Sequence, residues 1–466
     1  MEIGQLPPQI HTPPPANTAE MLVDRLAESE CPALTMRRAR RSEEIGAPYD
    51  PIVWHAARDC NVVDVDGNRY VDMSAGFGAA AVGHGHPRVV AALAKQGSTL
   101  LHALGDLHPS DAKVHLLTRL AELAPFPEAR VMLGLSGADA VEAALKTAVL
   151  ATGRPGVLAF TGGYHGLATG VLPVCGYRDE FRAPFAEQSG QHVVFAPYPG
   201  ADVAVESAML AVTTALAEAT VPVGAVLVEP VQGRAGVRVP PPEFLASLSE
   251  LCRAQGMLLI ADEVLTGLGR SGVRFLSVEA GAEPDLICLG KALGGGLPTS
   301  ACLGRADVMA AWGEPGHEAI HTGTFLGNPL LSAAALATLE VLAEQRLADR
   351  ARRMGTYLQS RLHELKGNFA QIRAVRGVGL LVGVEFGAPG YALKVVHALL
   401  GRGYITVPAG AQGEVLSLTP PLTMEQGLMD GFIEALSDSL ADLGAAADSE
   451  AESEEAPVST ETAGEG

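Results

Sequence analysis

Several short runs of this 466-residue chain are apolar at almost every position, and they alternate with Ala- and Leu-rich stretches typical of helices. The runs are GVLAF (156–160), GAVLVEP (224–230), MLLIADEV (257–264) and DLICLGKAL (285–293). A strand with no polar face must be buried on both sides, as in a parallel sheet covered by helices. The sequence therefore predicts an α/β fold with a mostly parallel central sheet and with functional groups at the carboxyl ends of its strands.

The ends of the chain differ in composition from its middle, which predicts two domains flanked by two tails. Residues 1–30 begin with five prolines in the first 15 positions and are expected to form a flexible arm. Residues 91–340 form the predicted large domain, while residues 31–90 and 341–445 together form a smaller α+β domain. Residues 446–466 hold seven acidic and no basic side chains, which predicts a disordered tail.

Charge and cysteine usage limit the partners of the chain. It has 33 Lys and Arg against 53 Asp and Glu, a net charge of −20, and no basic block suited to nucleic acid. No segment approaches the roughly 18 apolar residues of a membrane span, and the N-terminus lacks the pattern of a secretion signal. The six cysteines form no CxxC pair, so we expect reduced thiols, no metal site and a cytoplasmic location.

Two motifs resemble ion or phosphate sites but lack necessary residues. The run from Asp64 to Asn68 is followed by Arg69 and Ala75 where a calcium loop needs Gly and Glu. Its Asp-Gly pair at 66–67 instead predicts the turn of a hairpin. Lys291 follows a glycine as in a P-loop, but the next residue is Ala292 where the motif needs Ser or Thr.

Two further motifs concern other classes of enzyme. The sequence around Ser136 nearly matches the nucleophile elbow of a serine hydrolase, but it ends in Ala138 where the motif needs Gly. A serine hydrolase is therefore kept only as a weak alternative. His84 and His86 could form a metal pair, yet no carboxylate partner is apparent, so we interpret them as loop residues.

Two side chains at the ends of buried runs fit one kind of chemistry. Lys291 follows the run DLICLG and precedes three glycines, which places its amine at a strand end with little steric bulk nearby. Asp262 ends the run MLLIAD, where a buried carboxylate needs a cationic partner. A protonated pyridine nitrogen would be such a partner.

Two glycine-containing segments add the means to bind a flat phosphorylated ligand. Ser136, Gly137, Ala138 and Asp139 lead directly into a helical stretch, whose N-terminus attracts a phosphate. The segment 161–166 carries Tyr164 among glycines that would allow an aromatic ring close to a flat ligand. Each segment alone would be interpreted as a capped helix or as a loop.

Taken together, these segments resemble the class III (ω-amino acid) aminotransferases, which are fold-type I enzymes that depend on pyridoxal 5′-phosphate. The resemblance extends from about residue 45 to residue 440, through YVDMSAGFGAAAVGHGHP, SGADAVEAALKTA, GGYHG, VEPVQGRAG, ADEVLTGLGRSG, CLGKALGGGLP and HTGTFLGNPLLSAAA. It implies that residues 91–340 bind the cofactor. It also implies that Lys291 bonds to the cofactor covalently, that Asp262 pairs with its pyridine nitrogen, and that Tyr164 stacks on its ring. His165 is a further cofactor-binding residue that the resemblance implies.

The resemblance further implies a homodimer with shared active sites. Gly137 and Ala138 would bind the cofactor phosphate through backbone N–H groups, and Thr324 would reach the phosphate of the neighbouring subunit. The Lys291 amine, with an ordinary pKa of ~10.4, must lose its proton to act as a base near neutral pH, which burial and a neighbouring cation favour.

Two departures from the family pattern concern the substrate. Many relatives carry an acidic residue in place of Arg234 and an arginine in place of Ser417, and that arginine binds the carboxylate of the amino acceptor. Our hypothesis is that Arg234 takes over this contact; the alternative is that it pairs with Glu229 or lies in solvent. Leu265 replaces a frequent Gln that hydrogen-bonds the cofactor's phenolic oxygen.

The expected function is transfer of an amino group from an amine or amino acid to a 2-oxo acid by a ping-pong mechanism. A racemase, epimerase or aminomutase of the same fold would use the same Lys291 and Asp262 and remains an alternative. A non-catalytic cofactor-binding module is a weaker one, because it has little need for a complete set of ring contacts together with the lysine.

Overall fold

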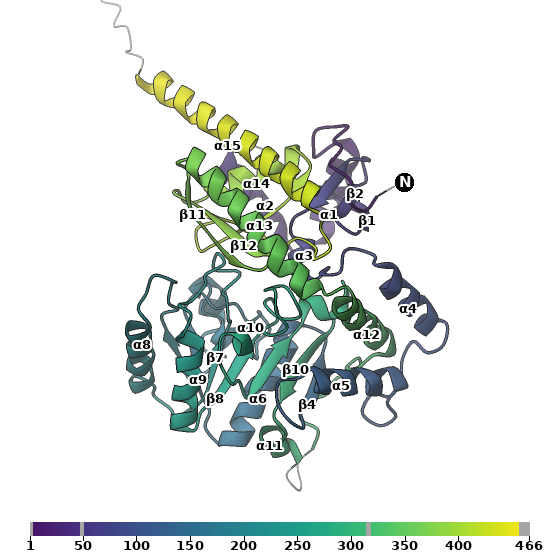
Figure 1. Ribbon diagram of the computed structural model, residues 1–466, viewed down its shortest axis with the longest axis vertical. Helices are drawn as coiled ribbons and strands as arrows, with labels where there is room; N and C mark the ends of the chain where they lie inside the picture. Colours follow the sequence, from purple (N-terminus) through teal and green to yellow (C-terminus); the bar gives the residue numbers. More distant parts are fainter. Residues whose placement is uncertain (1–2, 47–50, 314–317, 456–466) are drawn as a thin grey trace, which may run out of the picture.

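A seven-stranded sheet lies at the centre of the protein (Figure 1). The computed structural model describes residues 3–46, 51–313 and 318–455, with side chains as far as residue 446. In spatial order the sheet contains β4 (Arg130–Gly134), β10 (Ser300–Gly304), β9 (Leu286–Leu289), β8 (Leu258–Asp262), β7 (Val223–Val228), β5 (Gly156–Phe160) and β6 (Val193–Ala196). Only β10 runs antiparallel to its neighbours in this sheet. The predicted α/β fold with a mostly parallel sheet is confirmed.

Both faces of the central sheet are buried, as the uniformly apolar strands predict. In β5, Val157 and Ala159 pack in a cluster with α6 (Gly137–Thr152), while Leu158 and Phe160 pack on the other face. That second cluster includes side chains of α8 (Val205–Ala217) and α9 (Phe244–Gln255). The remaining elements of this part are α4 (Pro87–Gly97), α5 (Asp111–Leu123), α7 (Asp179–Arg182), α10 (Leu276–Glu279), α11 (Ala306–Met309), α12 (Pro329–Glu344) and the 3-10 turns η1 (Leu172–Val174), η2 (Ala183–Phe185), η3 (Lys291–Gly294) and η4 (Ala310–Gly313).

The two ends of the chain fold together at the other end of the molecule (Figure 1). One sheet joins β1 (Trp54–Arg58), β2 (Asn61–Asp64), β3 (Arg69–Asp72) and β13 (Tyr404–Ile405), and β13 pairs in parallel with β3. A second sheet contains β11 (Ile372–Val378), β12 (Leu381–Phe386), β15 (Val415–Leu418) and β14 (Val407–Ala409). The helices here are α1 (Asn17–Ser29), α2 (Pro32–Ile45), α3 (Ala75–Gly78), α13 (Leu347–Asn368), α14 (Tyr391–Gly401) and α15 (Gln426–Glu455). The domain boundaries near residues 90 and 340 stay a prediction.

Local turn chemistry explains the hairpin of β2 and β3. Gly67 adopts φ +86°, and the Asp64 carboxylate accepts hydrogen bonds from the backbone N–H groups of Asp66 and Asn68. The acidic run that resembles a calcium loop therefore caps its own turn.

The structure differs from the sequence prediction at both tails. Residues 3–16 are anchored, because Asn61 Oδ1 accepts from the N–H groups of Gly4 and Leu6, and Gln9 pairs with Arg69; α1 then follows within the segment predicted to be a flexible arm. At the other end α15 continues to Glu455, so the first part of the predicted disordered tail is helical. Ala and Glu favour a helix, and extending a packed helix avoids the cost of nucleation. The rest of that tail, 456–466, lies outside the described residues.

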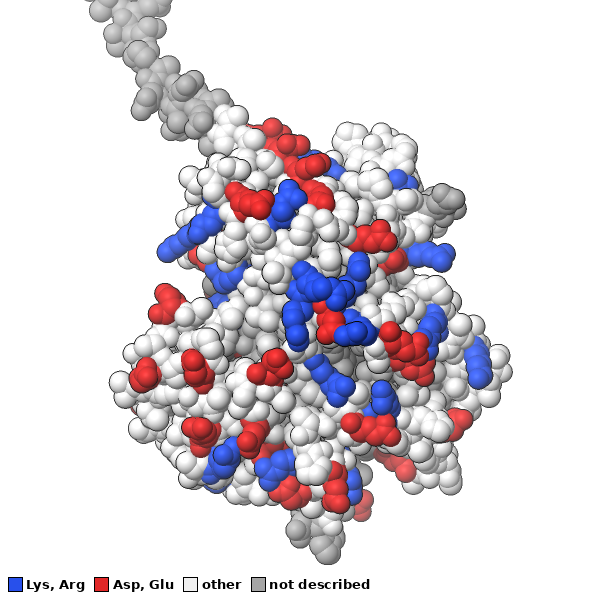
Figure 2. Space-filling view, in the orientation of Figure 1, with Lys and Arg blue, Asp and Glu red and all other residues white. Residues whose placement is uncertain are grey.

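One contact links the start of α13 to the loop before α15. Basic side chains gather near the middle of the face shown in Figure 2, where α13 begins. From this helix Arg350 donates hydrogen bonds to the carbonyl oxygens of Leu422, Thr423 and Met424 at 2.7 to 3.1 Å.

Across the described part of the chain, no helix is long and apolar enough to span a membrane.

Candidate active site

Four polar side chains lie where strands of the central sheet end or just beyond. Asp262 is the last residue of β8, and Glu229 directly follows β7. Lys291 comes two residues after β9, and Tyr164 lies in the loop after β5. Because the carboxyl ends of parallel strands meet at one edge of a sheet, the fold brings these groups together.

Asp262 and His165 form a buried pair. Their side chains are joined by a contact of 2.7 Å between Asp262 Oδ2 and His165 Nδ1, and the residues are only 5% and 3% exposed. The other carboxylate oxygen, Oδ1, accepts from the Val264 N–H at 3.1 Å. Burial opposes protonation of His165, but the hydrogen bond and charge of Asp262 prevail and raise the pKa of the imidazole. The pair, together with the Val264 N–H, fixes the direction of the Asp262 carboxylate.

Lys291 has the electrostatic setting of a base. Burial lowers the pKa of its amine, although the charges of Asp262 and Glu229 act in the opposite direction, and the charge of Arg234 lowers it further. Its backbone adopts φ +37°, an uncommon value for a residue with a side chain. Strain of this kind concentrates at functional sites, where the surrounding structure maintains it.

The N-terminus of α6 lies against the glycine that precedes Lys291. Ser136 and Asp139 form a reciprocal capping box, which leaves Gly137 and Ala138 as the first residues of the helix, where N–H groups have no partner within the helix. A Cβ atom on Gly290 would lie 3.7 Å from the Gly137 Cα, and one on Gly166 would lie 2.8 Å from the Ala138 Cβ. The chain thus brings the helix end, the lysine loop and the Tyr164 loop into direct contact.

Tyr164 is held by its backbone and flanked by two side chains. Its N–H donates to Glu229 Oε1 at 2.7 Å. Its ring meets Tyr177 edge to face at 6.1 Å between centroids, and the Arg234 Cζ lies 5.9 Å from its centroid. Arg234 also lies 5.5 Å from the centroid of Tyr177, and its Nε is buried without a hydrogen-bond partner in the described structure.

Three other residues that the sequence analysis singled out are not members of this group of polar side chains. Thr324 is exposed on a hollow lined by residues 102–107 and 322–324. Ser417 is buried in β15, opposite Gly383 and Val407. Leu265 lies beside the site, because a Cβ on Gly78 would be 3.2 Å from its Cδ1 and 3.7 Å from the Lys291 Cδ.

Glu229 is a member of the site that the sequence analysis did not assign to it. Burial raises the pKa of its carboxyl to about 7, against the charge of His165. The signal was present in the sequence, because Glu229 follows an apolar run in the same way as Asp262. Glu229 and Asp262 stand at the ends of neighbouring strands, so both could have been assigned to the same site from the sequence.

The donor set fits pyridoxal 5′-phosphate, whose parts are an aldehyde, a ring nitrogen that can be protonated, a flat ring and a phosphate. The chain offers an amine of lowered pKa, a fixed buried carboxylate, an aromatic side chain and a free helix N-terminus. Fold and site together define a fold-type I enzyme that depends on this cofactor.

Comparison with known proteins gives the family. The family model described as aminotransferase class-III matches residues 45–440. A 2-aminoadipate transaminase of Pseudomonas putida is 36% identical over 407 residues, covering 84% of this chain and 96% of that protein. An alanine/serine racemase of Pyrococcus horikoshii is 31% identical over 461 residues, covering 93% of each protein. The chain belongs to the class III aminotransferases.

A solved structure agrees with this assignment. An amine transaminase from an uncultivated Pseudomonas species, in its pyridoxal-phosphate-bound form, superposes with a TM-score of 0.78 and 28% identity, covering 84% of this chain and 95% of that one. The protein is therefore a pyridoxal-phosphate-dependent enzyme of the class III aminotransferases, and the weaker alternative of a non-catalytic binding module is not supported.

Proposed function

We propose that this enzyme transfers an amino group from an amine or amino acid to a 2-oxo acid in two half-reactions at Lys291. The observation that carries the proposal is the convergence of Lys291, Asp262, Glu229 and the N-terminus of α6 at one edge of the sheet. The cofactor supplies an aldehyde carbon that takes up the amino group and a ring that accepts the electron pair released at the substrate.

Each residue has a proposed task. Lys291 would hold the cofactor covalently at rest; once the substrate amine has displaced its Nζ, the freed Nζ would remove the proton from the substrate carbon that bears nitrogen. Asp262, oriented by His165, keeps a proton on the ring nitrogen. Tyr164 covers the ring, while the backbone N–H groups of Gly137 and Ala138 bind the phosphate.

Arg234 is the proposed anchor for the carboxylate of the substrate. Its guanidinium lies against Tyr164, and its charge acts on Lys291, so it is close to the proposed reaction centre. Glu229 is bonded to the N–H of Tyr164, and no ion pair joins it to Arg234 among the described side chains. The structure thus gives no support to the alternative in which Arg234 neutralises Glu229.

We also propose a homodimer in which Thr324 completes the phosphate site of the partner. Leu101, Leu104 and Leu107 are 60%, 61% and 77% exposed, and they lie near Phe325, which is 55% exposed and contacts His102. Such apolar side chains beside Thr324 favour burial by a second copy. The six free cysteines agree with our placement of the enzyme in the cytoplasm.

A spectrum of the holoenzyme tests the proposed reaction. Adding 2-aminoadipate, the compound in the name of the Pseudomonas relative, or a simple primary amine should shift the visible absorbance of the cofactor, and a 2-oxo acid should reverse the shift. A panel of donors with no spectral change and no new oxo product contradicts transamination.

The similarity to an alanine/serine racemase keeps racemisation as a second candidate. A racemase converts one enantiomer of an amino acid into the other without any oxo acid. Chiral analysis of the products, with and without an acceptor, separates the two reactions.

A further inference from the structure

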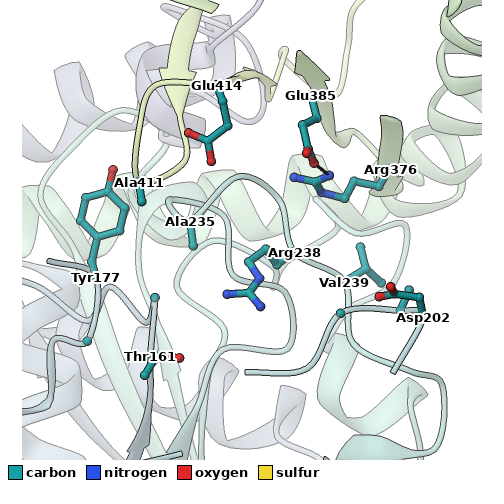
Figure 3. A pocket seen from close by; sticks show the side chains of 14 residues that line it. Thr161, Tyr177, Asp202, Ala235, Arg238, Val239, Arg376, Glu385, Ala411 and Glu414 are labelled. Atoms are coloured by element: carbon teal, nitrogen blue, oxygen red, sulfur yellow. Dashed lines mark hydrogen bonds and ion pairs between the residues drawn. The ribbon is translucent and has the colours of Figure 1, made fainter. Parts of the chain in front are cut away.

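A cavity of about 630 Å³ lies beside the active site, and Tyr177, whose ring Arg234 contacts, forms part of its lining. The close-up in Figure 3 shows its walls, which come from the loops after β5, β6 and β7, from β11 and β12, and from the loop before β15. Ala235, the residue after Arg234, faces this space, and so does Tyr177. Val239, Ala235 and Ala411 make part of the lining apolar. The volume suits a small organic molecule.

The two arginines in the wall differ in their partners. Arg376 is fully engaged, because it forms an ion pair with Glu385 and donates to the carbonyl oxygens of Gly236 and Val237. The guanidinium of Arg238 donates one hydrogen bond in the described structure, from Nη2 to the carbonyl oxygen of Tyr198 at 2.6 Å, and its Cζ lies 5.8 Å from the centroid of the Tyr198 ring. Its guanidinium points into the cavity in Figure 3.

The charge of Arg238 is not balanced by a neighbouring acid. Within the described part of the chain, no carboxylate lies within ion-pair distance of its guanidinium. Partial burial lowers the pKa of Arg238, and the positive charge of Arg376, which repels that of Arg238, lowers this pKa further. A partly desolvated cation beside a second cation gains free energy when an anion binds.

The other charges in the cavity select the kind of anion. Asp202, Glu385 and Glu414 also belong to the lining, and Glu414 accepts a hydrogen bond from the Gln412 N–H rather than forming an ion pair. These carboxylates repel a multiply charged group such as phosphate more strongly than a singly charged one. From this arrangement we infer that the cavity is a second binding site, in which Arg238 binds the carboxylate of a small organic acid with an aliphatic body.

The carboxylate that binds Arg238 has two possible sources, the substrate itself or a separate acid. The inference rests on the proposed function only if the source is the substrate. If Arg234 moves aside, the distal carboxylate of a long substrate reaches Arg238 past Tyr177. Otherwise a separate acid occupies the cavity while the substrate is at Lys291. Both sources require the same contact with Arg238.

The test uses pentanoate, which has one carboxylate, an aliphatic chain, and neither an amine nor an oxo group to react. Calorimetry on the holoenzyme should show saturable binding of pentanoate and much weaker binding of inorganic phosphate. The variant Arg238→Gln should bind pentanoate about tenfold to a hundredfold more weakly, and Arg238→Lys should recover part of the loss. Val239→Trp, which keeps the cation and fills the cavity, should also abolish binding.

Two outcomes would overturn the inference, and a competition experiment identifies the source of the carboxylate. Equal affinity of the wild type and Arg238→Gln overturns it, and so does loss of binding in Arg234→Gln but not in Arg238→Gln, because the carboxylate would then sit at the active site. Competition between pentanoate and the amino donor identifies the distal end of the substrate as the source, whereas binding without competition identifies a separate acid. Pentanoate binding needs no turnover, so a failure of the proposed reaction would be seen separately.

Discussion

The Oδ2 atom of Asp262 lies 2.7 Å from Nδ1 of His165, and the two side chains shield each other from solvent. The carboxylate cannot turn without breaking this contact and the hydrogen bond from the Val264 N–H. A charge fixed in this way requires little reorganisation during a reaction. We therefore propose that the pair acts as one unit, in which His165 is a positioning residue for Asp262.

Replacing Asp262 should affect the chemical step more than substrate binding. Asp262→Asn removes the charge that stabilises a protonated ring, so kcat should fall by about a hundredfold or more while KM changes little. Steady-state kinetics and the affinity for the cofactor are the measurements. Asp285→Asn is a matched control, because Asp285 is also buried and accepts a backbone hydrogen bond, from Leu259 at 2.8 Å. An effect of Asp262→Asn confined to KM contradicts the proposed role.

Lys291→Ala should fold, form dimers and bind the cofactor without a covalent bond. Its turnover should be almost abolished, since both covalent attachment and proton transfer depend on the same amine. Gel filtration, cofactor absorbance and a product assay check the three statements. A variant that keeps more than about a few per cent of the wild-type rate would be incompatible with the assignment.

The free energy of unfolding of the cofactor-free protein should fall as the pH rises, because the buried Glu229 carboxyl must then ionise. Its carboxyl has a pKa of about 7 in the folded protein against an ordinary value of 4.5, so the folded state binds the proton more tightly than the unfolded chain does. The stabilisation is complete below pH 4.5 and is lost as the pH rises to about 7, by up to about 3 kcal/mol. Denaturant unfolding across this range should show the loss in the wild type and a smaller one in Glu229→Gln. Equal pH profiles would contradict the assignment of the titration to Glu229.

The proposed dimer can be disrupted at its exposed leucines. Leu104→Asp combined with Leu107→Asp places two charges where a second copy would bury apolar side chains, so the protein should become monomeric and bind cofactor more weakly. Sedimentation and cofactor titration are the measurements. Leu210→Asp is a suitable control, because Leu210 is 67% exposed on α8, away from this hollow. If the double variant sediments like the wild type, this surface is not the interface.

The fold, and the meeting of Lys291 and Asp262 at one edge of the sheet, could be predicted from the sequence because both depend on local patterns. The uniformly apolar strands indicated burial on both faces. Asp262 ends one of these strands and Lys291 comes two residues after another, so their positions at the sheet edge could be predicted as well. The ordered arm could not be predicted, because it depends on Asn61 and Asn68, which lie dozens of residues away and bind its backbone. The link between His165 and Asp262 was missed for the same reason, since 97 residues separate them in the chain.

Arg234 is the residue whose role depends most on the structure. Its place in VQGRAG indicated nearness to the substrate but not the direction of its side chain. In the structure the guanidinium lies beside both Tyr164 and Tyr177, with its Cζ 5.9 and 5.5 Å from their ring centroids. The resemblance to the family implies an arginine where this chain has Ser417, so we propose that Arg234 meets the substrate carboxylate instead.

Arg234→Ala should therefore slow one half-reaction and leave the other nearly unchanged. Loss of a charge-assisted hydrogen bond costs roughly 1.5–3 kcal/mol, so kcat/KM for a 2-oxo acid acceptor should fall about tenfold to a hundredfold. The donor half-reaction with an amine that has no carboxylate makes no such contact and should change little. Arg178→Ala is the matched control, because Arg178 also lies over the Tyr177 ring, at 5.2 Å, but donates to the Ala411 carbonyl oxygen. Equal losses in both half-reactions would indicate that Arg234 supports Tyr164 and the cofactor instead, and no loss in either would move the carboxylate to another cation.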